Sequence, residues 1–213
     1  MKQDEDKYMR LDDFHKFIKV AKDHDMFWYY FFKTQALLGG RIGEMTLIQY
    51  NDIDLEHKKV YMPTLKQKFK KGRTEIRGDI NGVKRKVISI AVSFEHKEIE
   101  NYFKIQKGFI KEPYYFKQFF PVSRRSAIYH FKKICKLAGL IRDYSSHSIR
   151  HMFGYLTYQS YKELFGHGDL VATAKRMRHR RIEGENPTTT EMYMHLVEDE
   201  ERKLAKRMGE LIG

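Results

Sequence analysis

The chain has 213 residues, 41% of them hydrophobic and 14% aromatic, so it can bury a core, and a disordered chain is excluded. Cys135 is the single cysteine, which excludes an internal disulfide and a cysteine-rich zinc site and predicts a buried thiol. The net charge of +13 favours a polyanionic partner, above all nucleic acid. The charged N-terminus and the lack of a long apolar run predict a cytoplasmic protein without signal peptide or membrane span.

The N-terminal part reads as helical over residues 11–38. Apolar residues recur at helical spacing in LDDFHKFIKVAKDHD, and MFWYYFFKTQALL is apolar nearly all round, which predicts a buried helix. Gly39 and Gly40 break this pattern, and Arg41 follows at once. The segment RIGEMTLIQ is expected to form the next short helix.

Residues 52–92 change character to runs of β-branched residues that predict strands. Asn81 and Gly82 lie between two such runs and predict a two-residue hairpin turn. Helices are expected again at 94–108, at 123–140, at 148–165, at 169–178 and at 198–212. The predicted fold class is therefore mainly α with one small antiparallel β-sheet.

Four motifs stand out, far apart in the sequence: GGRIGEM with Arg41, HSIRHMF with His147 and Arg150, RMRHRR with His179, and TTTEMYMHL with Tyr193. In this order they resemble the catalytic domain of the tyrosine recombinase (phage integrase) family, over about residues 10–200. The resemblance implies that family's DNA breaking and rejoining fold. It also implies site-specific recombination or integration through a 3′-phosphotyrosyl intermediate, with no metal and no cofactor.

The residue types suit this chemistry. An arginine matches two phosphate oxygens with a planar fork, so Arg41 and Arg150 could clamp a phosphodiester and stabilise its transition state. A tyrosine phenol has an ordinary pKa near 10, and cationic neighbours favour its ionised form. The resemblance makes Tyr193 the nucleophile and His147 its base, and it makes His179 a hydrogen-bond donor to the phosphate.

In the family, a lysine on the hairpin of the sheet protonates the leaving 5′-oxygen. Its spacing after Arg41 favours Lys66, with Lys68 and Lys86 as alternatives. The other basic residues of this hairpin are predicted to contact DNA phosphates. The alternative is a basic hairpin that is simply exposed to solvent. The predicted contacts are Lys68, Lys70, Lys71, Arg73, Lys84 and Lys86.

The third and fourth motifs depart from the family pattern. Fourteen positions separate His179 from Tyr193, where about nine are usual, so we expect Tyr193 to lie away from the two arginines without DNA. His167 is a rival for the third site, but GHGDLVATAKRMRH as a whole places His179 there. Tyr158 and Tyr161 are rival nucleophiles, expected to pack in the core. His147 and His151 have zinc-ligand spacing, but neither a glutamate next to His147 nor a third ligand is evident.

We therefore expect a single catalytic domain over residues 1–213, with a core at about 10–197. The helix at 198–213 has few evident partners in its own chain and could dock onto a neighbouring subunit. We expect the family's N-terminal DNA-clamping domain to be absent from this chain. The expected partners are double-stranded DNA and further copies of the chain, as a tetramer in synapsis and a monomer when free. Type IB topoisomerase activity and non-catalytic DNA binding on the same fold are the alternatives.

Overall fold

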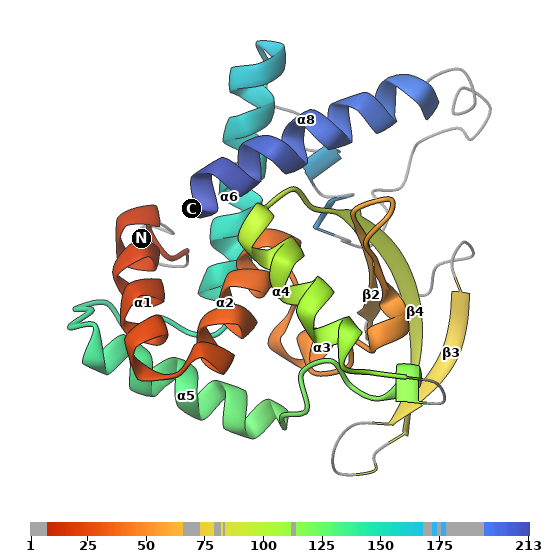
Figure 1. Cartoon of the computed structure of the whole chain (residues 1–213). Coiled ribbons are helices and arrows are strands. Elements are labelled where there is room, and N and C mark those ends of the chain that lie inside the picture. Colours follow the sequence, from red (N-terminus) through yellow and green to blue (C-terminus); the bar gives the residue numbers. More distant parts are fainter. Residues whose placement is uncertain are drawn as a thin grey trace.

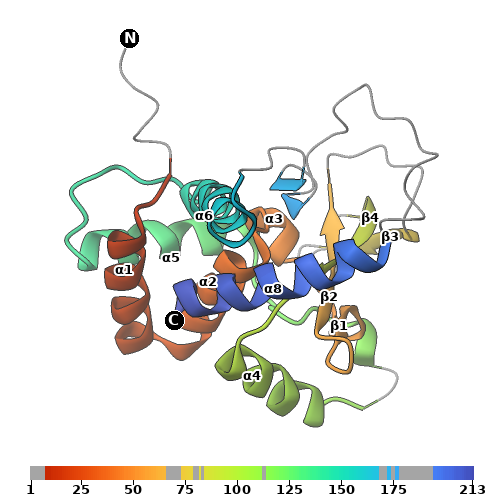
Figure 2. The same ribbon diagram turned by 90° about the horizontal axis from the view of Figure 1, so that it is seen from above.

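The computed structural model describes residues 8–65, 73–78, 82, 84–111, 114–167, 172–173, 176–177 and 194–213, without the side chains of residues 73, 74 and 194–201. Helices form one side of the molecule and a small sheet the other (Figures 1 and 2). The helices are α1 (Leu11–His24), α2 (Met26–Leu38), α3 (Ile42–Met45), α4 (Lys97–Gly108), α5 (Arg124–Leu137), α6 (Ser148–Phe165) and α8 (Met194–Ile212), with 3₁₀ turns η2 (Tyr50–Asp52) and η3 (Tyr114–Phe116). The strands are β1 (Ile53–Asp54), β2 (Lys59–Thr64), β3 (Arg73–Gly78) and β4 (Lys84–Ser93).

Helix α2 lies at the centre and contacts α1, α3, α4, α6 and α8. Its Phe31 and Phe32 are fully buried, as the continuous apolar pattern predicts. The helical stretch at 11–38 is two helices rather than one. Asp25 has extended backbone and accepts a hydrogen bond from the Phe27 N–H, so it ends α1 and caps α2. The core extends from Met9 to Ile212 and includes the free thiol of Cys135, whose burial was predicted.

The sheet has the order β1-β2-β4-β3, and every neighbouring pair is antiparallel. The predicted β3–β4 hairpin is confirmed, but its turn is not the two-residue turn at Asn81 and Gly82. The register pairs Gly78 with Lys84, so the connection spans five residues, 79–83. Gly82 has a φ of 75°, which fits the left-handed turn position that glycine favours.

The last helix packs on its own chain. Helix α8 contacts α2, α6 and β4 (Figure 1), and Leu204, Met208 and Ile212 are buried. The expectation that this helix has few contacts within its own chain is therefore wrong, because its apolar side packs on α2, α6 and β4, which are distant from it in sequence. Docking on a neighbouring subunit stays a prediction.

Gly209 sets how closely α8 can approach the segment between β4 and α4. A Cβ at this position would lie 1.8 Å from the backbone oxygen of Glu95. We expect Gly209→Ala to lower the free energy of unfolding by about 1–3 kcal/mol, because backbone cannot move aside as a side chain can. Urea denaturation measures the effect. Gly108→Ala is the matched control, since a Cβ there meets nothing within 4 Å, and equal stability of the two variants would contradict this packing.

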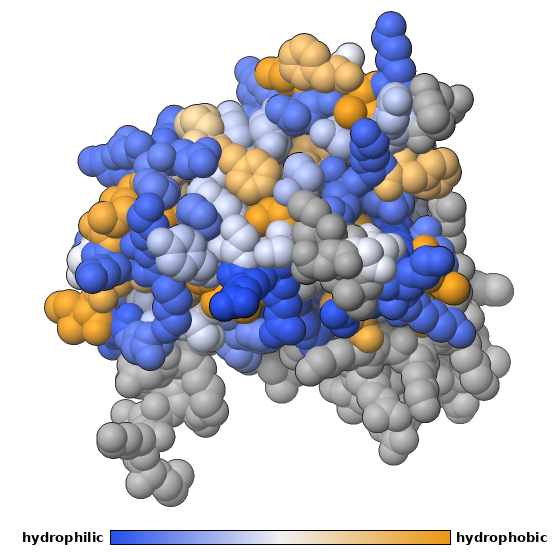
Figure 3. Space-filling view, turned by 90° about the horizontal axis from the view of Figure 1, so that it is seen from below, coloured by the Kyte–Doolittle hydropathy of each residue, from blue (hydrophilic) through white to orange (hydrophobic). Residues whose placement is uncertain are grey.

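The predicted helix at 169–178 falls mostly outside the described residues, although Ala172, Thr173 and Arg176 are helical. Hydrophilic side chains predominate on the face seen from below (Figure 3). Within the described part of the chain, no helix is both long and apolar enough to cross a membrane.

Candidate active site

Arg41 is presented by the turn between α2 and α3. Gly39 ends α2 with a φ of 59°, and a Cβ there would lie 2.3 Å from the Phe153 ring, so only glycine fits. Arg41 then has extended backbone and precedes α3. Its guanidinium Nη1 donates to Glu44 Oε1 at 2.9 Å, and its backbone N–H donates to Glu44 Oε2 at 2.9 Å. One carboxylate therefore holds both the side chain and the backbone of Arg41.

Arg150 lies in the first turn of α6, and its side chain is buried. Its Nη1 donates to the Gly39 carbonyl at 2.6 Å, and its Nη2 donates to the Met177 carbonyl. The first contact fixes Arg150 against the turn that presents Arg41. The second brings Met177, which precedes His179 by two positions, against the same guanidinium.

Glu44 joins the two arginines. Its carboxylate is fully buried, bonds Arg41 at 2.9 Å and lies 3.7 Å from Arg150 Nη1. Two guanidinium groups repel each other, and a buried anion between them lowers this repulsion while both keep their charge. Arg41, which directly precedes α3, and Arg150 of α6 are thus held together before any phosphate binds. The sequence motif contains Glu44, but only the structure shows that it bridges both arginines.

We expect Glu44→Gln to slow DNA cleavage by about 10–100-fold, because a neutral amide keeps the shape but leaves two cations uncompensated. The expected loss of unfolding free energy is about 1–3 kcal/mol. Single-turnover cleavage rates and urea denaturation measure the two effects. Glu163→Gln is the matched control, because Glu163 forms an exposed ion pair with Arg207. A Glu44→Gln enzyme as fast as the unmodified protein would contradict the bridging role.

His147 lies at the start of α6, one helical turn before Arg150. The residue is exposed, yet packing around its ring lowers its pKa, as do the neighbouring charges of His151, Arg41, Arg150 and Arg124. A lowered pKa keeps the ring neutral and able to accept a proton. Arg124 begins α5 and was not singled out from the sequence. Its Cδ would lie 3.5 Å from a Cβ at Gly43, so it borders the same region.

The pH dependence of cleavage should show this lowered pKa. If the neutral ring is the base, the rate falls as the pH drops through the pKa of His147, so the acidic limb should lie below the ordinary histidine value of about 6.5. We expect this limb in kcat/KM at subsaturating DNA, which reports the free enzyme. His147→Ala should remove it. A limb at or above about pH 6.5 in the unmodified protein would contradict the assignment.

Only part of the predicted site lies within the described residues. Arg41, His147 and Arg150 lie close together, and their catalytic roles stay predictions. His179 and Tyr193 lie outside, so the expected separation of Tyr193 from the arginines stays a prediction. Lys66, Lys68, Lys70 and Lys71 lie outside as well. Arg73 begins β3, and Lys84 and Lys86 begin β4 with exposed side chains.

Leu65, which immediately precedes Lys66, is close to the arginine turn. Its Cδ1 would lie 3.7 Å from a Cβ at Gly43. The end of β2 therefore borders α3, the helix that follows Arg41. Among the described residues, no group of three or more His, Cys, Asp or Glu side chains is placed to hold a metal ion.

A sequence profile of the phage integrase family matches residues 7–199. The chain belongs to the phage integrase family. The fold is similar to an integrase from mycobacterium phage Brujita (16% identity, 96% of this chain and 57% of that one, TM-score 0.55). It is also similar to a lambda integrase tetramer bound to a Holliday junction (15% identity, 84% and 49%, TM-score 0.53) and to a lambda integrase(75–356) dimer bound to a COC′ core site (15%, 84% and 60%, TM-score 0.52).

These structural similarities confirm the predicted fold class. The chain spans about half to three-fifths of the length of these three proteins. No curated protein sequence is significantly similar to it. Arg41, His147 and Arg150 follow one another in this order along the chain and come together where α3 lies next to the start of α6.

Proposed function

We propose that this integrase-family chain is a site-specific DNA recombinase that cleaves and rejoins DNA through a covalent phosphotyrosyl intermediate. The observation that carries the proposal is the pair Arg41 and Arg150, held side by side by the buried Glu44. Two fixed guanidinium groups suit a phosphodiester whose non-bridging oxygens gain charge in the transition state. His147, one turn from Arg150, supplies a group that accepts protons near neutral pH.

In the proposed reaction, the Tyr193 oxygen attacks the scissile phosphorus while the phenol proton passes to His147. The bond between phosphorus and the 5′-oxygen breaks, and Lys66 gives that oxygen a proton. The product is a 3′-phosphotyrosyl link with a free 5′-hydroxyl. The phosphodiester is exchanged rather than hydrolysed, so a 5′-hydroxyl from another strand can reverse the step without ATP.

DNA binding is supported by the net charge of +13 and by the exposed Lys84 and Lys86 at the start of β4. Recombination of two duplexes cuts and rejoins four strands, so we propose that four copies, one for each cut strand, act together on DNA and that free chains are monomers. The lambda integrase tetramer on a Holliday junction has the same fold and supports this assembly by analogy. We place the activity in the cytoplasm.

The covalent adduct tests this function. The protein is incubated with nicked suicide duplexes of random and phage-attachment-like sequence, in EDTA and without ATP, and then denatured in SDS. We expect a protein–DNA band that resists SDS and disappears with protease. Binding by gel shift without an adduct on any duplex would favour a non-catalytic DNA-binding protein. Relaxation of supercoiled plasmid without strand exchange between duplexes would favour a type IB topoisomerase.

A further inference from the structure

Gln35 is a buried polar residue of the central helix α2, and its side-chain amide lies between two turns that carry site residues. Its Nε2 donates to the Gly40 carbonyl at 3.0 Å and to the Ser146 carbonyl at 3.4 Å. An amide nitrogen carries two hydrogens, so it can make both hydrogen bonds at once. A single side chain therefore joins two backbone segments that are far apart in the sequence.

The two carbonyls belong to the peptide groups that lead into Arg41 and His147. Gly40 directly precedes Arg41, and the N–H of the same peptide group donates to Glu44 at 2.9 Å. This peptide group is therefore held from both ends. Ser146 directly precedes His147, so the shared amide also orients the peptide group that leads to the first turn of α6. Because a peptide group is planar, fixing its carbonyl also fixes the direction of the chain that follows.

The amide of Gln35 is not explained by packing of the core. Its Oε1 is buried and has no hydrogen-bond partner among the described residues. A buried oxygen without a partner lowers stability, and an apolar side chain of similar size would avoid this loss. The next two residues of α2, Ala36 and Leu37, are apolar and buried. What an amide adds at position 35 is therefore its two donor contacts.

We propose that Gln35 is a positioning residue that sets the spacing between Arg41 and His147 for DNA cleavage. In the proposed reaction, Arg41 binds the phosphate and His147 takes the proton of the group that attacks it, so the two must keep a fixed separation. Glu44 joins Arg41 to Arg150 through their side chains. Gln35 joins Arg41 to His147 through the backbone. The inference rests on the proposed function and extends it to a fully buried residue that does not touch the reacting atoms.

The pKa of His147 depends on this spacing. Burial of the ring lowers that pKa, and so do the positive charges around it, which belong to His151 and Arg150 on α6, Arg41 before α3 and Arg124 on α5. Without the amide, the ring moves away from Arg41 and towards solvent. Both causes then weaken, so the pKa rises towards the ordinary histidine value. A loss of stability alone does not change the pKa of the folded protein.

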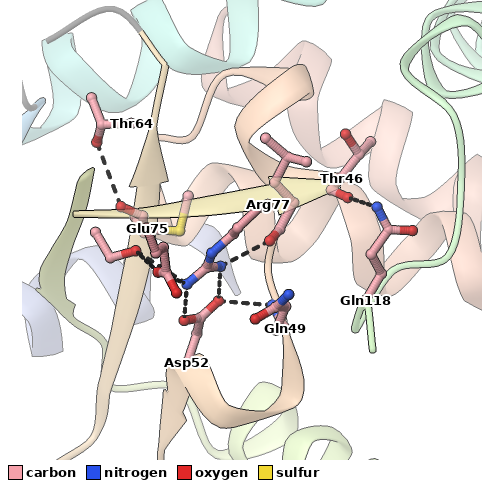
Figure 4. A network of polar contacts seen from close by, with 10 residues as sticks. Thr46, Gln49, Asp52, Thr64, Glu75, Arg77 and Gln118 are labelled. Carbon is pink, nitrogen blue, oxygen red and sulfur yellow. Dashed lines mark hydrogen bonds and ion pairs between the residues drawn. The ribbon is translucent and has the colours of Figure 1, made fainter. Parts of the chain in front are cut away.

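The experiment compares Gln35→Met with Gln118→Met. Methionine has a similar length and flexibility to glutamine but lacks the amide. Gln118 is the matched control because its amide also donates to a backbone carbonyl, that of Thr46 at 2.9 Å, at the end of α3 opposite to Arg41 (Figure 4). NMR titration of the histidine ring protons measures the pKa of His147, whose signal is identified by its absence from His147→Ala.

We expect Gln35→Met to raise the pKa of His147 in the free protein and Gln118→Met to leave it unchanged. At saturating DNA, we expect Gln35→Met to slow single-turnover cleavage by about 10-fold, because misplaced groups lose rate rather than affinity. DNA affinity should stay within about 3-fold of the unmodified protein, since no surface charge is removed. Gln118→Met should cleave within about 2-fold of the unmodified rate.

An unchanged pKa of His147 in Gln35→Met overturns the inference, as does an equal rise in Gln118→Met or an unchanged cleavage rate in Gln35→Met. If Gln35→Met does not fold, as judged by circular dichroism, Gln35→Asn carries the amide on a side chain that is one methylene shorter and cannot reach both carbonyls. A raised pKa of His147 in Gln35→Asn then supports the inference, and an unchanged pKa overturns it. Failure of the unmodified protein to form a covalent adduct overturns the proposed function instead, because titration of the free protein needs no cleavage.

Discussion

Replacement of Tyr193 by phenylalanine is expected to abolish the covalent adduct, a loss of at least about 10⁴-fold. The substitution removes one oxygen and leaves the ring, so DNA binding should stay within about 3-fold of the unmodified protein. The rate of adduct formation on a suicide duplex measures the first effect, and a gel shift measures the second. The expectation follows from covalent catalysis, because no other atom of the variant can take the place of the attacking oxygen.

Tyr144, Tyr158 and Tyr161 are poor substitutes for Tyr193. Tyr144 donates to Asp13 at 2.6 Å, and burial together with that carboxylate raises its pKa to about 12. Tyr161 is buried as predicted, whereas Tyr158 is only half-buried. These two lie about 12–16 Å along α6 from Arg150, at 1.5 Å per residue. Tyr161→Phe is therefore the control that should keep adduct formation. An adduct that survives Tyr193→Phe would contradict the assignment.

Arg150→Lys is expected to slow cleavage by about 10²–10³-fold while the charge of the site is unchanged. A lysine cannot present two parallel donors to a phosphate, and it cannot reach both the Gly39 and Met177 carbonyls that Arg150 contacts. The substitution removes the groups that orient the phosphate but keeps the positive charge that attracts it, so DNA affinity should change by less than about 3-fold. Single-turnover cleavage at saturating DNA separates the two effects.

Arg207→Lys is the matched control for this exchange. Arg207 also pairs with a carboxylate, Glu163 at 2.9 Å, but on the exposed surface between α8 and α6. Surface pairs of this kind contribute little, so we expect no change in the cleavage rate. Equal rates for Arg150→Lys and the unmodified protein would show that the buried guanidinium does not orient the phosphate.

The spacing of apolar residues predicted most of the helices, because the apolar side of each helix is the side that it buries. The continuous apolar run of α2 and the stripe of α5 follow directly. The break at Asp25 was missed because an aspartate at a cap and an aspartate inside a polar face look alike in sequence. The hairpin connection was predicted to be too short, because its length depends on the register between β3 and β4, which the turn residues alone do not determine.

The site was predictable in its residue types and not in its connections. The order of Arg41, His147 and Arg150 along the chain indicated which groups meet. The contact between Arg150 and the Gly39 carbonyl joins residues 111 positions apart, and no local spacing reports it. The bridging position of Glu44 depends on the packing of α6 against α2. Arg77 is one of the many basic residues between positions 58 and 86, and no local pattern separates it from the exposed ones, although it is buried.

We infer that one residue of this chain, Tyr193, becomes linked to DNA during cleavage. The most direct measurement digests the purified adduct with nuclease and trypsin and locates the remaining nucleotide by mass spectrometry. We expect a nucleotide on Tyr193, attached through its 3′-phosphate. A nucleotide on any other residue, or a 5′-phosphate linkage on Tyr193, would contradict it.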